Sequence, residues 1–98
     1  MQVEWTHPAL ADLIEAQAYL TEESPRAAEI IGQRIWDASQ LLEDNPYSGR
    51  EGHVTDTREL VVARTPYILV YGINPEQQRV EILHVYHGRR NWQAISDE

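Results

Sequence analysis

The dipeptide Ser24-Pro25 joins two segments of helical apolar spacing with no loop between them. The first segment is predicted to be a helix over residues 8–23, capped by Thr6. Ser24 is predicted to cap the second helix, which ends before Asn45-Pro46 because the residue preceding a proline avoids helical geometry. Two helices joined so closely form an antiparallel hairpin, and each has one apolar stripe to bury. The hairpin therefore needs a sheet to pack on.

The rest of the chain is predicted to supply the strands of that sheet. Segments rich in β-branched and aromatic residues alternate with turns, and the predicted strands are residues 2–5, 57–63, 67–73 and 79–86. Alternation in the last strand places Val80, Ile82, His84 and Tyr86 on one face, and Glu81, Leu83, Val85 and His87 on the other. The element order β-α-α-β-β-β predicts an α+β fold, with the helical hairpin on one face of a mainly antiparallel twisted sheet.

Length and composition limit the classes of protein to consider. The 98 residues are enough for one domain, and we expect a single domain over residues 1–98. Without cysteine there is no disulfide, thiolate metal site or thiol nucleophile, which fits the reducing cytoplasm. Glu4, Asp12 and Glu15 interrupt the start of the chain, and no window approaches the ~20 apolar residues of a membrane span. We expect a cytoplasmic protein without membrane contact.

The net charge of −8 is concentrated in the first half of the chain. Residues 1–47 hold nine acidic residues against two arginines, whereas residues 48–98 hold seven against six. Every basic residue is arginine, which favours bidentate contacts with phosphate or carboxylate groups. Because duplex DNA repels an anionic protein, direct sequence-specific DNA binding by this chain alone is not expected.

Cationic, titratable and aromatic side chains converge where the last predicted strand ends. The sequence His87-Gly88-Arg89-Arg90-Asn91-Trp92 follows that strand directly, and glycine allows a sharp change of direction. This tail predicts a site for an anionic target, with guanidinium groups beside an aromatic plane. The predicted target-binding residues are Arg58, Arg64, Arg89, Arg90 and Trp92. Alternatively, the arginines pair with acids of their own chain, such as Glu59 and Glu81.

The same region could support acid–base chemistry. A ribonuclease needs a base, an acid and a cation, and histidine, tyrosine, glutamate and arginine fill these roles without metal. The candidate catalytic residues are His84, Tyr86, His87 and Arg89. Because His84 and His87 lie three residues apart on a strand, they face opposite sides and no metal site is predicted. No cofactor fingerprint is present, and the alternative role of His84 is that of a packed or hydrogen-bonded residue.

Several segments together resemble a known family. They are residues 24–28, 45–52, 57–62, 65–71 and 87–92, which read SPRAA, NPYSGREG, TRELVV, TPYILVY and HGRRNW. In order and spacing they are similar to the RelE/ParE superfamily of bacterial type II toxin-antitoxin toxins. The resemblance implies a helical hairpin on a twisted antiparallel sheet, which is the fold predicted above from periodicity.

The resemblance also implies a growth-inhibiting toxin that is neutralised by a cognate antitoxin. Apolar residues of the helical hairpin could seat the antitoxin in a helix-in-groove mode. The predicted antitoxin-binding residues are Leu13, Tyr19, Ile31 and Trp36. In such families the complex represses its own operon, and the antitoxin makes the DNA contacts.

Members of the superfamily have one of two activities, so the resemblance implies that this chain has one or the other. ParE-like members poison DNA gyrase, whereas RelE-like members cut messenger RNA in the ribosomal A site. Where ribonuclease members tend to carry a catalytic arginine this chain has Ile68, and it has no lysine for an RNA-binding surface. A ParE-like gyrase toxin is therefore the first expectation.

Three alternatives to a gyrase toxin stay open. The first is a RelE-like messenger RNA endonuclease, and the others are an inactive relative that only binds its antitoxin and an oligomerising structural domain. The nuclease roles would be divided among acid, base and phosphate stabiliser. The acid would be His87 or Tyr86, the base Glu59 or His84, and the stabiliser Arg58, Arg64 or Arg89.

Overall fold

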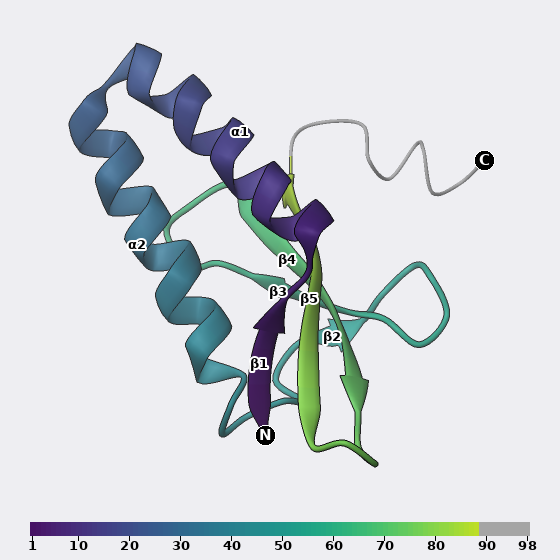
Figure 1. Ribbon diagram of the computed structural model, residues 1–98. Coiled ribbons are helices and arrows are strands. Elements are labelled where there is room, and N and C mark those ends of the chain that lie inside the picture. Colours follow the sequence, from purple (N-terminus) through teal and green to yellow (C-terminus); the bar gives the residue numbers. More distant parts are fainter. Residues whose placement is uncertain (89–98) are drawn as a thin grey trace.

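The computed structural model describes residues 1–88 and has the predicted α+β order (Figure 1). Its elements are β1 (Gln2–Trp5), α1 (His7–Glu23), α2 (Pro25–Leu41), β2 (Arg50–Glu51), β3 (Arg58–Val61), β4 (Tyr67–Asn74) and β5 (Arg79–His87). Within the described residues, neither helix is long and apolar enough to cross a bilayer. The fold class expected from the sequence is confirmed.

The five strands form one sheet in the order β1-β5-β4-β3-β2. All neighbouring strands are antiparallel except β1, which runs parallel to β5. Both helices lie on one side of this sheet (Figure 1), so its other side is a helix-free face. Strand β2 was not predicted, because a strand of two residues is too short to show alternation. Strand β3 ends before the predicted boundary, and the chain turns at Arg64, whose φ is 62°.

Single residues cap the helices and tie them to the sheet. The Ser24 backbone N–H donates to the Leu20 carbonyl at the end of α1, and its hydroxyl accepts the Ala27 N–H at the start of α2. The Thr6 hydroxyl accepts the Ala9 N–H and donates to the Ile82 carbonyl of β5, at 2.7 Å. Both predicted caps are confirmed, and Thr6 also fixes the start of α1 against β5.

The core lies between the hairpin and the sheet, and it anchors one long loop. Ile35 and Leu42 pack there against strand residues such as Leu69 and Tyr71, all with no exposed surface. The Tyr71 hydroxyl donates to the Pro46 carbonyl at 2.7 Å and accepts the Gly49 N–H at 2.9 Å. The loop before β2 is thereby held against the sheet.

A β-bulge in β5 changes which side chains face the core. Val70 pairs with His84 and the next residue, Tyr71, pairs with Ile82, so Leu83 is the extra residue. Ile82 and Val85 face the core, whereas His84 pairs with Val70 on the helix-free face. The prediction that His84 shares a face with Ile82 is therefore wrong, because strict alternation takes no account of an inserted residue.

Candidate functional site

Strand β5 ends beside the turn between β3 and β4, and this junction is called here the tail end of the sheet. It comprises residues 64–66 and 86–88, and the Gly88 N–H donates to the Pro66 carbonyl at 2.6 Å. A Cβ at position 88 would lie 3.1 Å from that carbonyl oxygen, so glycine suits the close approach. The predicted residues Arg89, Arg90 and Trp92 follow directly and lie outside the described residues.

A carboxylate of α1 holds His84 at the free edge of β5. One oxygen of Asp12 lies 3.0 Å from His84 Nδ1 and accepts the Val85 backbone N–H at 3.0 Å. The pairing of β1 with β5 ends at Trp5 and Ile82. Asp12 therefore bonds to the part of β5 that β1 does not cover. Nothing in the sequence pairs Asp12 with a histidine 72 residues later, and sequence reasoning missed this contact.

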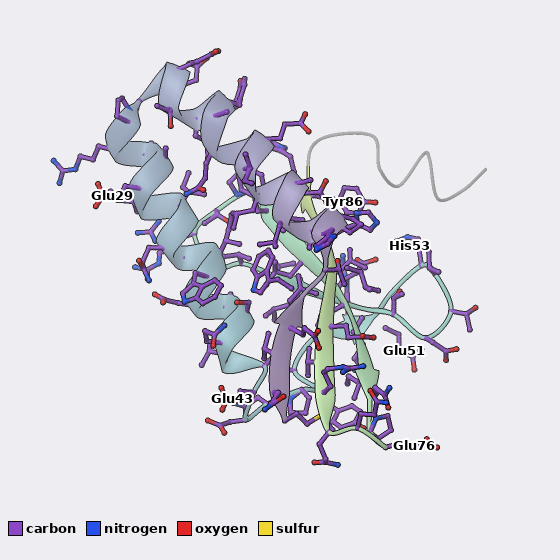
Figure 2. The ribbon with its side chains drawn as sticks, in the orientation of Figure 1. Glu29, Glu43, Glu51, His53, Glu76 and Tyr86 are labelled. Atoms are coloured by element: carbon purple, nitrogen blue, oxygen red, sulfur yellow. The ribbon has the colours of Figure 1, made fainter. Side chains whose placement is uncertain are left out.

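The aromatic neighbours of the two histidines confirm that they face opposite sides. His84 stacks on Tyr86 with ring centroids 5.3 Å apart, whereas His87 meets Tyr67 edge to face, also at 5.3 Å. Figure 2 shows Tyr86 close to α1. Burial raises the pKa of Tyr86, and the negative charge of Asp12 raises it further. A phenol with a raised pKa gives up its proton less readily, which counts against an acid role for Tyr86.

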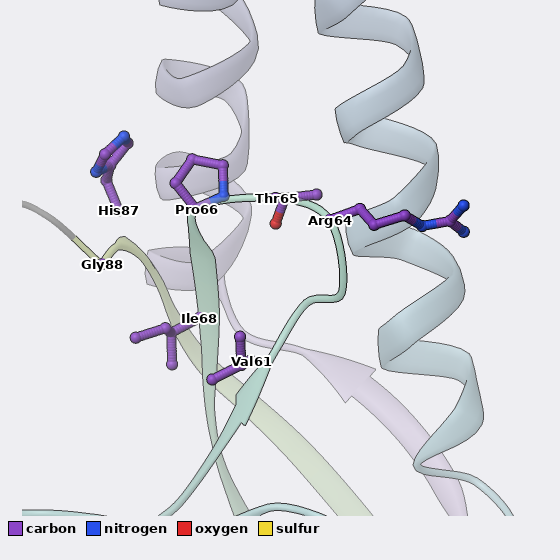
Figure 3. Close-up of a pocket in the computed structure, with 7 residues that line it drawn as sticks. All are labelled: Val61, Arg64, Thr65, Pro66, Ile68, His87 and Gly88. Carbon is purple, nitrogen blue, oxygen red and sulfur yellow. The ribbon is translucent and has the colours of Figure 1, made fainter.

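A shallow cavity of about 560 Å³ opens at the tail end of the sheet (Figure 3). Its lining residues are Val61, Arg64, Thr65, Pro66, Ile68, His87 and Gly88. Val61 is 56% exposed, so an apolar side chain is presented to solvent at its rim. Figure 3 shows the Arg64 side chain extending to the side away from His87. The structure thus brings Arg64 and His87 around one cavity, with their polar ends apart.

Arg58 occupies a different part of the molecule. Its Nη1 donates to the Gly49 carbonyl at 2.7 Å, and its guanidinium lies 5.0 Å from the centre of the Tyr47 ring. Arg58 pairs with the core residue Tyr71 on β4, so it starts from the helix-covered side of the sheet. The structure does not bring Arg58 together with the tail end of the sheet.

The candidate base Glu59 is enclosed in a charged cluster. One oxygen of its buried carboxylate lies 3.1 Å from Arg50 Nη2, and the other accepts the His53 backbone N–H at 3.3 Å and lies 3.1 Å from His53 Nδ1. Burial alone would raise the pKa of Glu59, but the hydrogen bonds from His53 and Arg50 outweigh it and lower the pKa. Glu59 therefore pairs with an arginine that sequence reasoning did not name. Glu81 likewise lies beside an arginine outside the tail, because its carboxylate is 3.6 Å from Arg79 Nη2.

The predicted antitoxin-binding residues divide into exposed and half-buried pairs. Tyr19 is 49% exposed and Trp36 is 46% exposed, whereas Leu13 and Ile31 pack partly against the core. Trp36 stacks on Trp5 of β1 with ring centroids 6.0 Å apart. Further large apolar side chains exposed on the hairpin are Leu10, Ile14, Ile30 and Leu41. The hairpin thus offers apolar surface to a protein partner.

Comparison with known proteins gives a consistent family. The sequence profile described as the ParE toxin of type II toxin-antitoxin system, parDE, matches residues 3–92. The protein Y4kP of Sinorhizobium fredii, named as a candidate toxin, is 40% identical over 94 residues, which cover 96% of this chain and 95% of that protein. Toxin RelE2 of Caulobacter vibrioides is 37% identical over 89 residues, covering 91% and 97%.

A solved structure agrees with these sequences. A chain of the chromosomal ParDE toxin-antitoxin system from P. aeruginosa superposes with a TM-score of 0.77 and 26% identity, covering 89% of this chain and 95% of that one. Sequence profile, relatives and fold coincide over nearly the whole length. This chain belongs to the ParE toxin family of type II toxin-antitoxin systems, within the RelE/ParE superfamily.

Proposed function

We propose that this protein inhibits growth as a ParE-like toxin that binds DNA gyrase, without chemistry of its own. Membership of the family implies a cognate antitoxin as partner, and the antitoxin would neutralise the toxin. A gyrase target would place the protein in the cytoplasm. The target-binding surface would be the tail end of the sheet together with Arg89, Arg90 and Trp92.

The observation that carries this proposal is that Arg50, Arg58 and Arg64 are held elsewhere or directed away from His87. Among residues 1–88, Arg50 is engaged by Glu59, and Arg58 by the Gly49 carbonyl. Arg64 lines the cavity, but its side chain extends away from His87 (Figure 3). Cleavage of RNA needs a cation beside the phosphorane, whereas Arg50 and Arg58 are held by other groups and Arg64 is directed away from His87 (Figure 3). A surface for protein contact is the better fit.

The cavity at the tail end has the chemistry of a protein interface. Val61 and Ile68 give it apolar walls, and Arg64 lies at its side. Arginine is one of the residue types that contribute most to protein binding, and here it lies beside an apolar depression. Arg89, Arg90 and Trp92 would extend this surface. Arg58 would contribute indirectly, by holding the loop before β2.

A second candidate function is supported by one arrangement. A RelE-like, metal-independent messenger RNA endonuclease would use His84 as base. The Asp12 carboxylate can only accept a hydrogen bond, so Nδ1 of His84 is the donor in their contact. In the neutral ring the other nitrogen is then the acceptor, on a side chain that is 43% exposed. His87 would be the acid in preference to Tyr86, whose raised pKa disfavours that role, and Arg89 would be the phosphate stabiliser. The name of one relative, Toxin RelE2, supports this second candidate.

Expression in cells separates the two functions. Induction of the chain is expected to raise a DNA-damage response while translation continues, as a gyrase target requires. The double substitution Arg89→Ala and Arg90→Ala is expected to abolish toxicity, and Arg26→Ala, at an exposed arginine of α2, is the matched control. Immediate translation arrest with cuts in ribosome-bound messages would instead identify the nuclease. Full toxicity of the double variant at equal expression would refute the site for either target.

A further inference from the structure

A second, smaller cavity lies between α1 and the end of β5, and it is called here the α1 pocket. Its volume is about 220 Å³. Among its lining residues are two carboxylates, three tyrosines and a histidine, namely Asp12, Glu15, Tyr19, Tyr67, Tyr86 and His87. The acids and Tyr19 come from α1, and the other three come from β4 and β5. Tyr86 and His87 also belong to the tail end of the sheet, but the proposed gyrase surface makes no use of the residues that α1 contributes.

The α1 pocket is a site of negative potential with aromatic walls. Helix α1 carries four acidic residues and neither arginine nor lysine, and no cationic side chain of that kind lines the pocket among residues 1–88. The charge of Asp12 acts on the Tyr86 phenol, where it adds to the effect of burial in raising the pKa. Such a field repels phosphate and attracts a cation.

The size and chemistry of the pocket identify the group that it accepts. Pockets for small ligands measure ~300–1,000 Å³, so 220 Å³ fits the end of one side chain. A guanidinium is planar, stacks on aromatic rings and donates to carboxylates with paired N–H groups, whereas an ammonium is a strongly hydrated point charge. We propose that the α1 pocket binds an arginine side chain of the cognate antitoxin.

The surroundings of the pocket favour the antitoxin over the toxin's target. Tyr19 forms part of the pocket and is also 49% exposed on the hairpin, which carries the apolar surface for a protein partner. Asp12 already bonds to His84 and Val85 through Oδ2, whereas within residues 1–88 no bond to another residue holds Glu15 on the exposed surface of α1, so Glu15 is the more accessible carboxylate. A partner arginine would therefore contact Glu15 and the ring of Tyr19.

Two capped tripeptides test the chemistry directly. The ¹⁵N-labelled protein is titrated with acetyl-Ala-Arg-Ala-amide and with the same peptide carrying citrulline, which keeps the shape and lacks the charge. The arginine peptide is expected to give saturable shifts at the amides of Ala16, Val85 and His87, and the citrulline peptide to bind at least about 5-fold more weakly. Equal binding of both peptides, or no saturation by arginine, would overturn the proposal.

A pair of variants then tests the partner. Glu15→Gln removes one charge from the pocket, and Glu22→Gln removes one from the exposed end of the same helix. Glu15→Gln is expected to weaken binding of the antitoxin cloned from the same operon about 3- to 5-fold, with Glu22→Gln near wild type and gyrase inhibition unchanged. If Glu15→Gln impairs gyrase inhibition instead, or leaves antitoxin affinity unaltered, the assignment is wrong. The antitoxin measurement stands even if gyrase is not the target.

Discussion

Replacing Tyr71 by phenylalanine removes a single oxygen from the centre of the fold. The Tyr71 hydroxyl accepts the Gly49 N–H at 2.9 Å and donates to the Pro46 carbonyl at 2.7 Å, and the residue has no exposed surface. Phenylalanine fills nearly the same space, so no large cavity forms. The substitution therefore isolates the contribution of two hydrogen bonds that hold the loop before β2.

The expected loss follows from the groups left without partners. A buried polar group that loses its hydrogen bond costs about 1–3 kcal/mol, and the Pro46 carbonyl lies near the surface where water replaces part of its bond. Tyr71→Phe should therefore lower the free energy of unfolding by about 2–4 kcal/mol. A domain of 98 residues has about 5–15 kcal/mol in total, so the variant still folds.

Urea unfolding measures this loss. With an m-value of about 2 kcal/mol/M, the midpoint should fall by about 1–2 M while the m-value stays unchanged. The amide of Gly49 should also exchange with solvent faster. Tyr47→Phe, at a residue that is 59% exposed, is the control and should shift stability by less than about 0.5 kcal/mol. A loss below 0.5 kcal/mol in Tyr71→Phe would refute the account of how this loop is held.

Three further substitutions test other parts of the structure. Ser24→Ala removes the cap between α1 and α2 and should cost about 1 kcal/mol by thermal or urea unfolding, a result that Ser24→Asn should largely restore. Glu59→Gln should destabilise the fold at neutral pH and weaken the loss of stability on acidification. Because the pKa of Glu59 is lowered in the folded state, its stabilisation is present above its ordinary pKa of 4.5 and is lost as pH falls through the folded value. An unchanged dependence of stability on acidic pH would contradict the role of the cluster. Asp12→Ala leaves the Val85 N–H without its acceptor, and hydrogen exchange should accelerate at Val85 but not at Val80, which β1 covers.

The sequence predicts the framework well because local signals determine it. Thr6 and Ser24 are caps in the structure as in the sequence, and the apolar stripe of α2 contributes Ile35 and Ala38 to the core. The order and type of the main elements follow from periodicity alone. Together these elements form the α+β fold. The parallel pairing of β1 with β5 was not predicted, because no local sequence pattern encodes it.

The arrangement of the site was harder to predict because it depends on contacts between distant residues. The bulge at Leu83 sets the face of His84, and Asp12 reaches His84 from an element 72 residues away. Arg58 was a target-binding candidate by residue type, but its guanidinium binds the loop at Gly49. Each of these outcomes follows from tertiary geometry. A strand pattern or a charge count does not contain that information.

We propose that this toxin acts by contact with gyrase and not by cutting RNA. The direct measurement adds the purified protein to a gyrase supercoiling assay and, in parallel, to translating ribosomes on a defined message. A gyrase toxin should cause loss of supercoiling with accumulation of cleaved DNA, and it should leave the message intact. Normal supercoiling with cuts in the ribosomal A site would contradict it.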